Sequence, residues 1–181
     1  MAIFSVAIKG LGAFINTPSG AYAYVPCKLR FPQVIFGLEK SSIIIQLEDF
    51  FKPKVIYPNM TKYMPFVYDE KEYITNQKCF IITGNHVAYL TAFFNSSLFK
   101  YCFRDSFPEL QGGTRELSKI FFDKIPVYEV SDALNLQFHD AIEDIQKEYN
   151  KQKAQRIDFM LFDLYGLTAE ERKVIGFVEI L

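Results

Sequence analysis

The stretch HVAYLTAFFNSSLFKYCF, residues 86–103, constrains the fold of this chain more than any other feature of its sequence. Apolar side chains occupy nearly every side of the helix that this stretch predicts, and such a helix must be covered by other elements all round. Asn95, Ser96, Ser97 and Lys100 interrupt the stretch, so it lacks the roughly 18 continuous apolar residues that a membrane span needs. We therefore expect a buried central helix and no membrane contact.

Short strands are predicted before this helix. Seven stretches are rich in β-branched and aromatic residues, and each is bounded by Gly, Pro, Asn or Asp. The spacing between several of them leaves no room for a crossover helix, so we expect mostly antiparallel pairing. The predicted strands are residues 3–8, 21–26, 34–36, 42–47, 54–57, 66–68 and 79–83.

Helices are predicted after residue 117. Ser118 is the expected N-cap of a short helix that must stop before Pro126, and Ser131 caps an amphipathic helix over residues 131–153. A further helix ends at Gly166, and TAEE at residues 168–171 is a capping box that opens the last helix. The apolar stripe of the amphipathic helix consists of Leu134, Phe138, Ala141, Ile145 and Tyr149, and that of the next helix of Ile157, Leu161 and Leu164.

Together these patterns predict an α+β fold. A small, mostly antiparallel sheet region surrounds part of a buried central helix, and a C-terminal helical hairpin follows. Half of the residues are hydrophobic, which is enough for one domain with a substantial core. The chain has three cysteines and no CxxC spacing, which indicates reduced core thiols in a cytoplasmic protein.

Residues that carry catalysis are scarce. The two histidines, His86 and His139, lie on different predicted helices, and no GxSxG, HExxH, P-loop or dinucleotide-binding pattern is present. In YDEKEY, the neighbouring side chains of Asp69, Glu70 and Lys71 point to different faces of a strand or turn, so they do not converge on one metal ion. We therefore expect no catalytic residue and no metal site in this chain.

The middle of the chain has the composition of a nucleic-acid-binding surface. Residues 52–115 carry eight basic and five acidic side chains, whereas residues 116–181 carry eight and thirteen. Lysines contact phosphates in such surfaces, and Asn and Thr contact base edges. An edge strand that Lys and Pro protect from aggregation explains the same residues equally well. The candidates in FKPKVIYPNMTKYMPF are Lys52, Lys54, Tyr57, Asn59, Thr61, Lys62 and Tyr63.

Three blocks of sequence share their order and spacing with a known family. They are KPKVIYPNMTKYMPFVYDEKEYITNQKCFIITG (52–84), YLTAFFNSSLFKYCFRDSFPELQGGTRELSKIFFDKIPV (89–127) and IDFMLFDLYGLTAEERKVI (157–175). Together they resemble the TaqI-like C-terminal specificity domain, or target recognition domain, of type IIG restriction–modification enzymes and related adenine-specific DNA methyltransferases. The resemblance covers residues 48–178, whereas residues 1–47 match the pattern poorly.

The resemblance implies a domain that reads double-stranded DNA and positions a methyltransferase/endonuclease domain or subunit on its target site. Residues 1–130 would form the target-recognition α/β domain, and residues 131–181 a C-terminal helical segment packed on it. The parent enzyme would use S-adenosylmethionine and magnesium. This chain has no S-adenosylmethionine motif and no Asn-Pro-Pro-Tyr-type motif, so no cofactor is expected in it.

The resemblance also places the glycine loop after the buried helix toward DNA. Gly112 and Gly113 would let the backbone approach a phosphate closely, and Thr114 and Arg115 would reach the phosphate or a base edge. The alternative for Arg115 is an intramolecular ion pair with a carboxylate such as Glu116 or Asp123.

Two other functions remain open at this point. The chain is an architectural domain of the same kind of complex if the helix over residues 131–153 docks on a partner protein. The other is one half of a type I-like specificity subunit, since such subunits usually hold two copies of the domain joined by long helices and one copy is found here.

Overall fold

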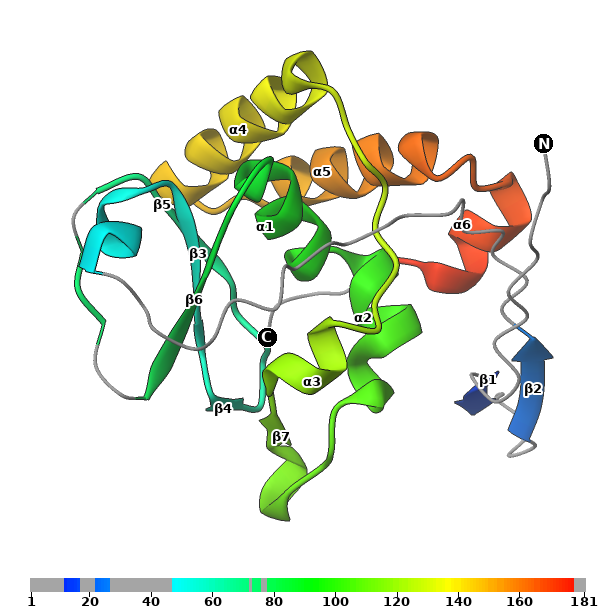
Figure 1. Ribbon diagram of the computed structural model, residues 1–181. Coiled ribbons are helices and arrows are strands. Elements are labelled where there is room, and N and C mark those ends of the chain that lie inside the picture. The colour runs from blue at the N-terminus through cyan, green and yellow to red at the C-terminus, as the bar shows by residue number, and fades with distance from the viewer. Residues whose placement is uncertain (1–11, 17–21, 27–46, 72, 76–77, 178–181) are drawn as a thin grey trace, which may run out of the picture.

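The computed structural model describes residues 12–16, 22–26, 47–71, 73–75 and 78–177, and within them it confirms the α+β fold (Figure 1). The strands are β1 (Gly12–Asn16), β2 (Tyr22–Pro26), β3 (Lys54–Pro58), β4 (Met60–Thr61), β5 (Val67–Asp69), β6 (Cys79–Thr83) and β7 (Arg115–Glu116). The α-helices are α1 (Val87–Asn95), α2 (Ser97–Phe103), α3 (Lys119–Phe122), α4 (Asp132–Lys147), α5 (Lys151–Leu164) and α6 (Ala169–Ile175). Three short 3-10 turns are η1 (Leu47–Phe51), η2 (Arg104–Ser106) and η3 (Gln111–Gly113).

The apolar stretch at residues 86–103 is buried as predicted, but it forms two helices, α1 and α2, instead of one. Ser96 between them has an extended backbone, with φ −71° and ψ 157°. Its Oγ accepts a hydrogen bond from the Phe99 N–H and donates one to the Phe93 carbonyl. Because one side chain bonds the last turn of α1 and the first turn of α2, the chain changes direction there without exposing the apolar stretch.

Helix α1 lies at the centre of the molecule, between the sheet β5–β3–β6 and α4 (Figure 1). β3 is the middle strand and pairs antiparallel with both neighbours. Its alternate residues Val55 and Tyr57 are buried in the core. On the side of α4, the rings of Tyr89 and Phe138 lie 5.3 Å apart. The core is rich in aromatic rings, and those with at most 1% exposure include Tyr89, Phe93, Phe99, Phe107, Phe138 and Phe162.

Side-chain amides from two helices pair the outer edge of β5. Asn95, at the end of α1, accepts from the Phe66 N–H at 3.2 Å and donates to the Phe66 carbonyl at 2.7 Å. Gln146, on α4, makes the same two bonds with Tyr68, at 2.8 Å and 3.0 Å. An edge strand normally leaves every second N–H and C=O unpaired. Here the two amides take the place of a neighbouring strand.

Helices α4 and α5 form the predicted C-terminal hairpin. α4 ends at Lys147, earlier than predicted, because Asn150 caps α5 by accepting from the Gln152 N–H at 2.7 Å. The predicted capping box of Thr168 and Glu171 opens α6. Residues on both sides of the expected boundary at residue 130 contribute to one hydrophobic cluster.

The apolar stripe of α4 faces its own chain. Phe138 and Ala141 are buried, and Leu134 and Ile145 pack against the same core, whereas Tyr149 is 53% exposed. This packing leaves the stripe unavailable as a docking face for a partner, which removes the observation that favoured the architectural alternative.

Some predicted strands cannot be compared with the structure. Residues 3–8, 34–36 and 42–46 lie outside the described residues, and Leu47 begins η1 instead of ending a strand. The strands predicted at 21–26, 54–57, 66–68 and 79–83 correspond to β2, β3, β5 and β6, whereas β1, β4 and β7 were not predicted.

Candidate nucleic-acid interface

The two stretches predicted to face DNA, around Asn59 and around Gly112, meet at the end of the molecule opposite α4 (Figure 1). β4 pairs antiparallel with β7, so that Thr61 lies opposite Arg115. The Leu117 N–H extends this pairing by donating to the Asn59 carbonyl at 2.8 Å. Residues more than 50 positions apart in sequence thus form one surface, which no local pattern in the sequence predicts.

The glycine loop is the turn of a β-hairpin, residues 108–116, which we call the tip hairpin. The Leu110 N–H donates to the Thr114 carbonyl at 2.6 Å, and the Glu116 N–H donates to the Pro108 carbonyl at 3.1 Å. η3 forms the turn between the two arms, and Figure 1 shows the hairpin projecting below the body of the molecule at β7. A turn of about three residues with glycine in the left-handed conformation is a common hairpin connection.

Both glycines of the turn have backbone conformations that favour glycine, and both have open space where a side chain would stand. Gly112 has φ 75° and Gly113 has φ 77°, in the region that other residues rarely adopt. Among the described residues, no heavy atom lies within 4 Å of the place where a Cβ would stand at either position. The turn is therefore not packed against the described body, and its backbone is free to approach a ligand closely.

Arg115 is held inside the tip hairpin, which favours the intramolecular alternative over a direct DNA contact. The residue is only 8% exposed. Its Nη2 lies 2.9 Å from both Asp105 Oδ1 and Glu109 Oε2, and its Nη1 donates to the Phe107 carbonyl at 2.8 Å. These carboxylates differ from the two that the sequence suggested. The guanidinium joins the arms of the hairpin and offsets one of the two negative charges at its base.

Lys54 and Tyr57 face the interior, which corrects their assignment to the DNA surface. Lys54 is 0% exposed; its Nζ lies 2.6 Å from Asp69 Oδ2 and donates to the carbonyls of Phe50 and Lys71 at 2.8 Å and 2.5 Å. Tyr57 lies in the aromatic core, and burial raises its pKa to about 12. Because successive strand residues point to opposite faces, both faces of β3 must be covered at these two positions.

The remaining candidates of this segment divide between two places. Lys52 is exposed beside η1 and forms an ion pair with Asp49 at 2.8 Å. Lys52 precedes β3, whereas Lys62 and Tyr63 follow β4. The length of β3, at roughly 3.3 Å per residue, therefore separates Lys52 from the other two. Lys62 and Tyr63 are exposed at the same end as the tip hairpin, and Tyr63 is 61% exposed. Thr61 Oγ1 shapes this corner by accepting from the N–H groups of Tyr63 and Met64.

Two exposed residues of this surface are not among the DNA-contacting residues predicted from the sequence. Gln111 is the first residue of the turn, and Lys78 lies beside Asn59, whose N–H donates to the Lys78 carbonyl at 2.9 Å. The short arms around a glycine-containing turn are a hairpin signal that would have directed attention to Gln111. Lys78 carries no such signal, because only the tertiary structure brings it next to Asn59.

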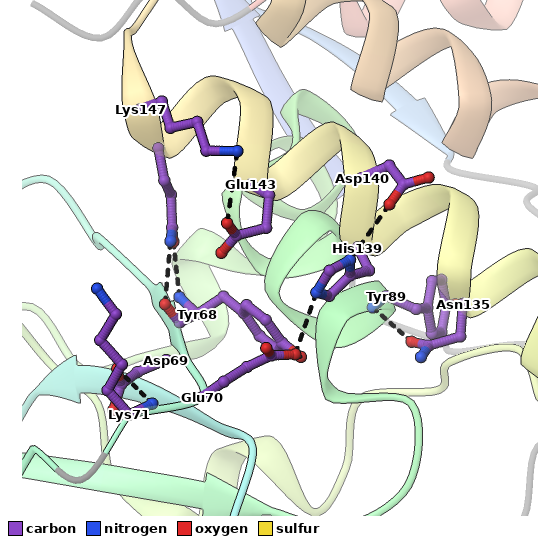
Figure 2. A network of polar contacts seen from close by, with 11 residues as sticks. Tyr68, Asp69, Glu70, Lys71, Tyr89, Asn135, His139, Asp140, Glu143 and Lys147 are labelled. Atoms are coloured by element: carbon purple, nitrogen blue, oxygen red, sulfur yellow. Dashed lines mark hydrogen bonds and ion pairs between the residues drawn. The ribbon is translucent and has the colours of Figure 1, made fainter.

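A second polar network lies where α4 meets β5 (Figure 2). The Tyr68 hydroxyl donates to the Glu70 carboxylate, whose Oε1 lies 3.0 Å from His139 Nε2. Burial and this hydrogen bond raise the pKa of Tyr68. Asp69 turns instead toward the Lys71 N–H, so the three neighbouring charged residues do not converge, as predicted. His139 ties α4 to the sheet, and this network is part of the scaffold.

The comparison with known families identifies one match. Residues 26–127 match the model of the TaqI-like C-terminal specificity domain. The match covers more than half of the chain and contains β3 to β7, α1 to α3 and the tip hairpin. It begins before the first block that suggested the resemblance and ends before the third. No curated protein matches the chain, and no helix among the described residues is long and apolar enough to cross a bilayer.

Proposed function

Because the chain belongs to the family of TaqI-like C-terminal specificity domains, we propose that it is the sequence-specific DNA recognition domain of a type IIG-like restriction–modification system. In this proposal it reads a duplex sequence and positions an adenine methyltransferase/endonuclease domain or subunit on its target. The family match carries the proposal, since it contains both stretches that meet at β4 and β7.

The DNA-contacting surface in this proposal is the recognition end, which we define as residues 59–63, Lys78 and the tip hairpin. Lys62 and Lys78 supply exposed positive charge, and Tyr63 supplies an exposed ring. Lysines of this kind contact phosphates, and polar side chains such as Asn59 contact base edges. Compared with the set expected from the sequence, this surface leaves out Lys52, Lys54 and Tyr57, and Arg115 supports the tip hairpin from within instead of contacting DNA.

Catalysis and its cofactors belong to the partner in this proposal. S-adenosylmethionine and magnesium would be held by the methyltransferase/endonuclease, and this chain would bind neither. Incubation of the purified chain with duplex DNA and both cofactors should therefore give no methyl transfer and no strand cleavage. Either product, formed by protein free of other nucleases and methyltransferases, would assign the activity to this chain.

The direct test is a selection from a pool of duplexes with a randomised central segment. The full chain is incubated with the pool at low salt, the bound duplexes are sequenced, and the cycle is repeated. We expect enrichment of one sequence motif, because base-edge contacts discriminate between base pairs by about 1–3 kcal/mol each. Binding without any enriched motif would contradict sequence-specific recognition, and no binding at all would contradict the whole proposal.

A further inference from the structure

Given the proposed function, on which this step rests, we propose that the tip hairpin enters the major groove and that Gln111 at its turn reads an adenine. Gln111 is not among the candidates predicted from the sequence, and only the fold shows its position at the turn. It is the first residue of the turn and is exposed, and no other described residue hydrogen-bonds its side-chain amide. A Gln amide presents one donor and one acceptor, which match N7 and N6 of adenine in the major groove.

The dimensions and stiffness of the hairpin suit insertion into a groove. The major groove is wide enough for a two-stranded β-ribbon. The arms are joined by two backbone hydrogen bonds, which together form an antiparallel bridge at Glu109 and Arg115. Arg115 also clamps the base of the hairpin through its two carboxylate partners and the Phe107 carbonyl. A side chain at the turn is therefore presented from a rigid element, as recognition of one base requires.

The chemistry around Gln111 also fits an A·T base pair. Leu110, directly before it, is 39% exposed and offers apolar surface for the thymine methyl group. Gly112 and Gly113, directly after it, have no side chain to hold the backbone away from the duplex. Arg115 pairs with both Asp105 and Glu109 at the base of the hairpin and offsets one of their two negative charges, which reduces their repulsion of nearby phosphates.

The test repeats the duplex selection with three variants of the full chain. Gln111→Ala removes the amide. Gln111→Glu replaces it with a group that only accepts hydrogen bonds, which suits the N4 amino group of cytosine. Gln137→Ala is the matched control, because Gln137 is an exposed glutamine on α4, at the opposite end of the molecule. Thermal unfolding of each variant should match the wild type, since all the substitutions are on exposed side chains.

We expect the wild-type motif to contain an adenine that Gln111→Ala alone no longer enriches, with a loss of preference of roughly 5- to 150-fold at that position. The other positions of the motif should persist. Gln111→Glu should move the preference at the same position from adenine toward cytosine. The Gln137→Ala motif should equal that of the wild type.

Three results separate this inference from the function on which it rests. If the wild type enriches a motif and Gln111→Ala enriches the same motif unchanged, base reading by Gln111 is overturned while DNA recognition stands. If Gln111→Ala weakens every sequence alike, the side chain contacts the backbone of the duplex and does not read a base. If the wild type enriches nothing, the proposed function fails and the inference fails with it.

Discussion

In the lysine-rich segment before β4, the direction of each side chain decides whether it belongs to the core or to the surface. Lys54 has two carbonyl acceptors, an ion pair with Asp69 and no solvent access, whereas Lys52, two residues earlier, is exposed. The ammonium group of Lys54 and the carboxylate of Asp69 are both buried away from solvent. Such a buried ion pair contributes little to the free energy of unfolding relative to an apolar pair of similar shape. Removing one partner is strongly destabilising, because the other charge then stays buried without a partner. Lys54 is therefore part of the scaffold of the domain.

Replacing Lys54 with Met should lower the free energy of unfolding by about 3–5 kcal/mol, because the Asp69 carboxylate stays buried without its partner. The double variant Lys54→Met/Asp69→Leu should recover most of the loss. Urea denaturation measures both. Lys52→Ala is the control and should cost under about 1 kcal/mol, since its pair with Asp49 is exposed. A single Lys54→Met variant as stable as the wild type would contradict the buried pair.

Asp158 joins α5 to the start of α2 and responds to pH. Its Oδ1 accepts from the Ser97 N–H at 2.8 Å, and its Oδ2 accepts from the Ser97 hydroxyl at 2.6 Å. Burial raises the pKa of this carboxyl, although the hydrogen bonds from Ser97 and the charge of Lys100 oppose the shift. A raised pKa in the folded state means that protonation favours folding. The contribution of Asp158 to stability is fully present when the pH is below the pKa of this carboxyl in the unfolded chain. It is lost as the pH rises through the pKa of the carboxyl in the folded chain.

Asp158→Asn should remove this part of the pH dependence, because the amide is neutral at every pH. Its oxygen can accept from the Ser97 N–H, and its NH2 group can donate to the Ser97 hydroxyl oxygen. The unfolding free energy of the variant relative to the wild type should be higher at about pH 7 than at about pH 4. Urea titrations at both pH values test this. Glu129→Gln, an exposed carboxylate, is the control. Parallel stability curves for Asp158→Asn and the wild type would show that burial does not raise this pKa.

At the scale of elements, β5 depends on side chains for the pairing of its outer edge. The amide of Asn95 bonds both backbone groups of Phe66, directly before β5, and that of Gln146 bonds both backbone groups of Tyr68 within it. Leaving a backbone N–H and C=O without partners costs more where water cannot replace the amide. Asn95 is half-buried and also bonds the Thr91 carbonyl, whereas Gln146 is exposed.

Asn95→Ala should therefore cost about 1–3 kcal/mol, and Gln146→Ala less. Native-state hydrogen exchange resolves the two contacts separately. The Phe66 N–H should exchange faster only in Asn95→Ala, and the Tyr68 N–H only in Gln146→Ala. Unchanged exchange at both amides in both variants would show that the two side chains do not protect this edge.

The sequence predicts the elements with strong local patterns and misses those that depend on distant contacts. β6 matches its predicted bounds, and the capping box that opens α6 is present, because both rest on neighbouring residues. The sequence does not predict the break between α1 and α2 at Ser96, because serine is tolerated inside helices. The break depends on the two hydrogen bonds that the Ser96 hydroxyl makes with the backbone. β4 and β7 have two residues each and exist only through their pairing. The position of Arg115 likewise depends on Asp105 and Glu109, which the fold brings to it.

At the scale of the whole molecule, the two ends differ in structure. The recognition end consists of short strands and turns that carry exposed Lys62, Tyr63 and Gln111. The opposite end consists of α4 and α5 (Figure 1), which together carry six acidic and four basic side chains. Between them, α1 and the aromatic core form a rigid connection. A polyanion should therefore be attracted to the end with the tip hairpin and repelled by the helical end.

The measurement that tests this account most directly is the affinity for a random-sequence duplex across a salt series. The wild type should bind weakly, with a log–log slope of about −3 to −5 from about three to five phosphate contacts. Lys62→Ala should make the slope smaller in magnitude by about one. Lys147→Ala, an exposed lysine on α4, should leave affinity and slope unchanged. A wild-type affinity insensitive to salt, or an effect of Lys147→Ala as large as that of Lys62→Ala, would contradict DNA recognition at the tip-hairpin end.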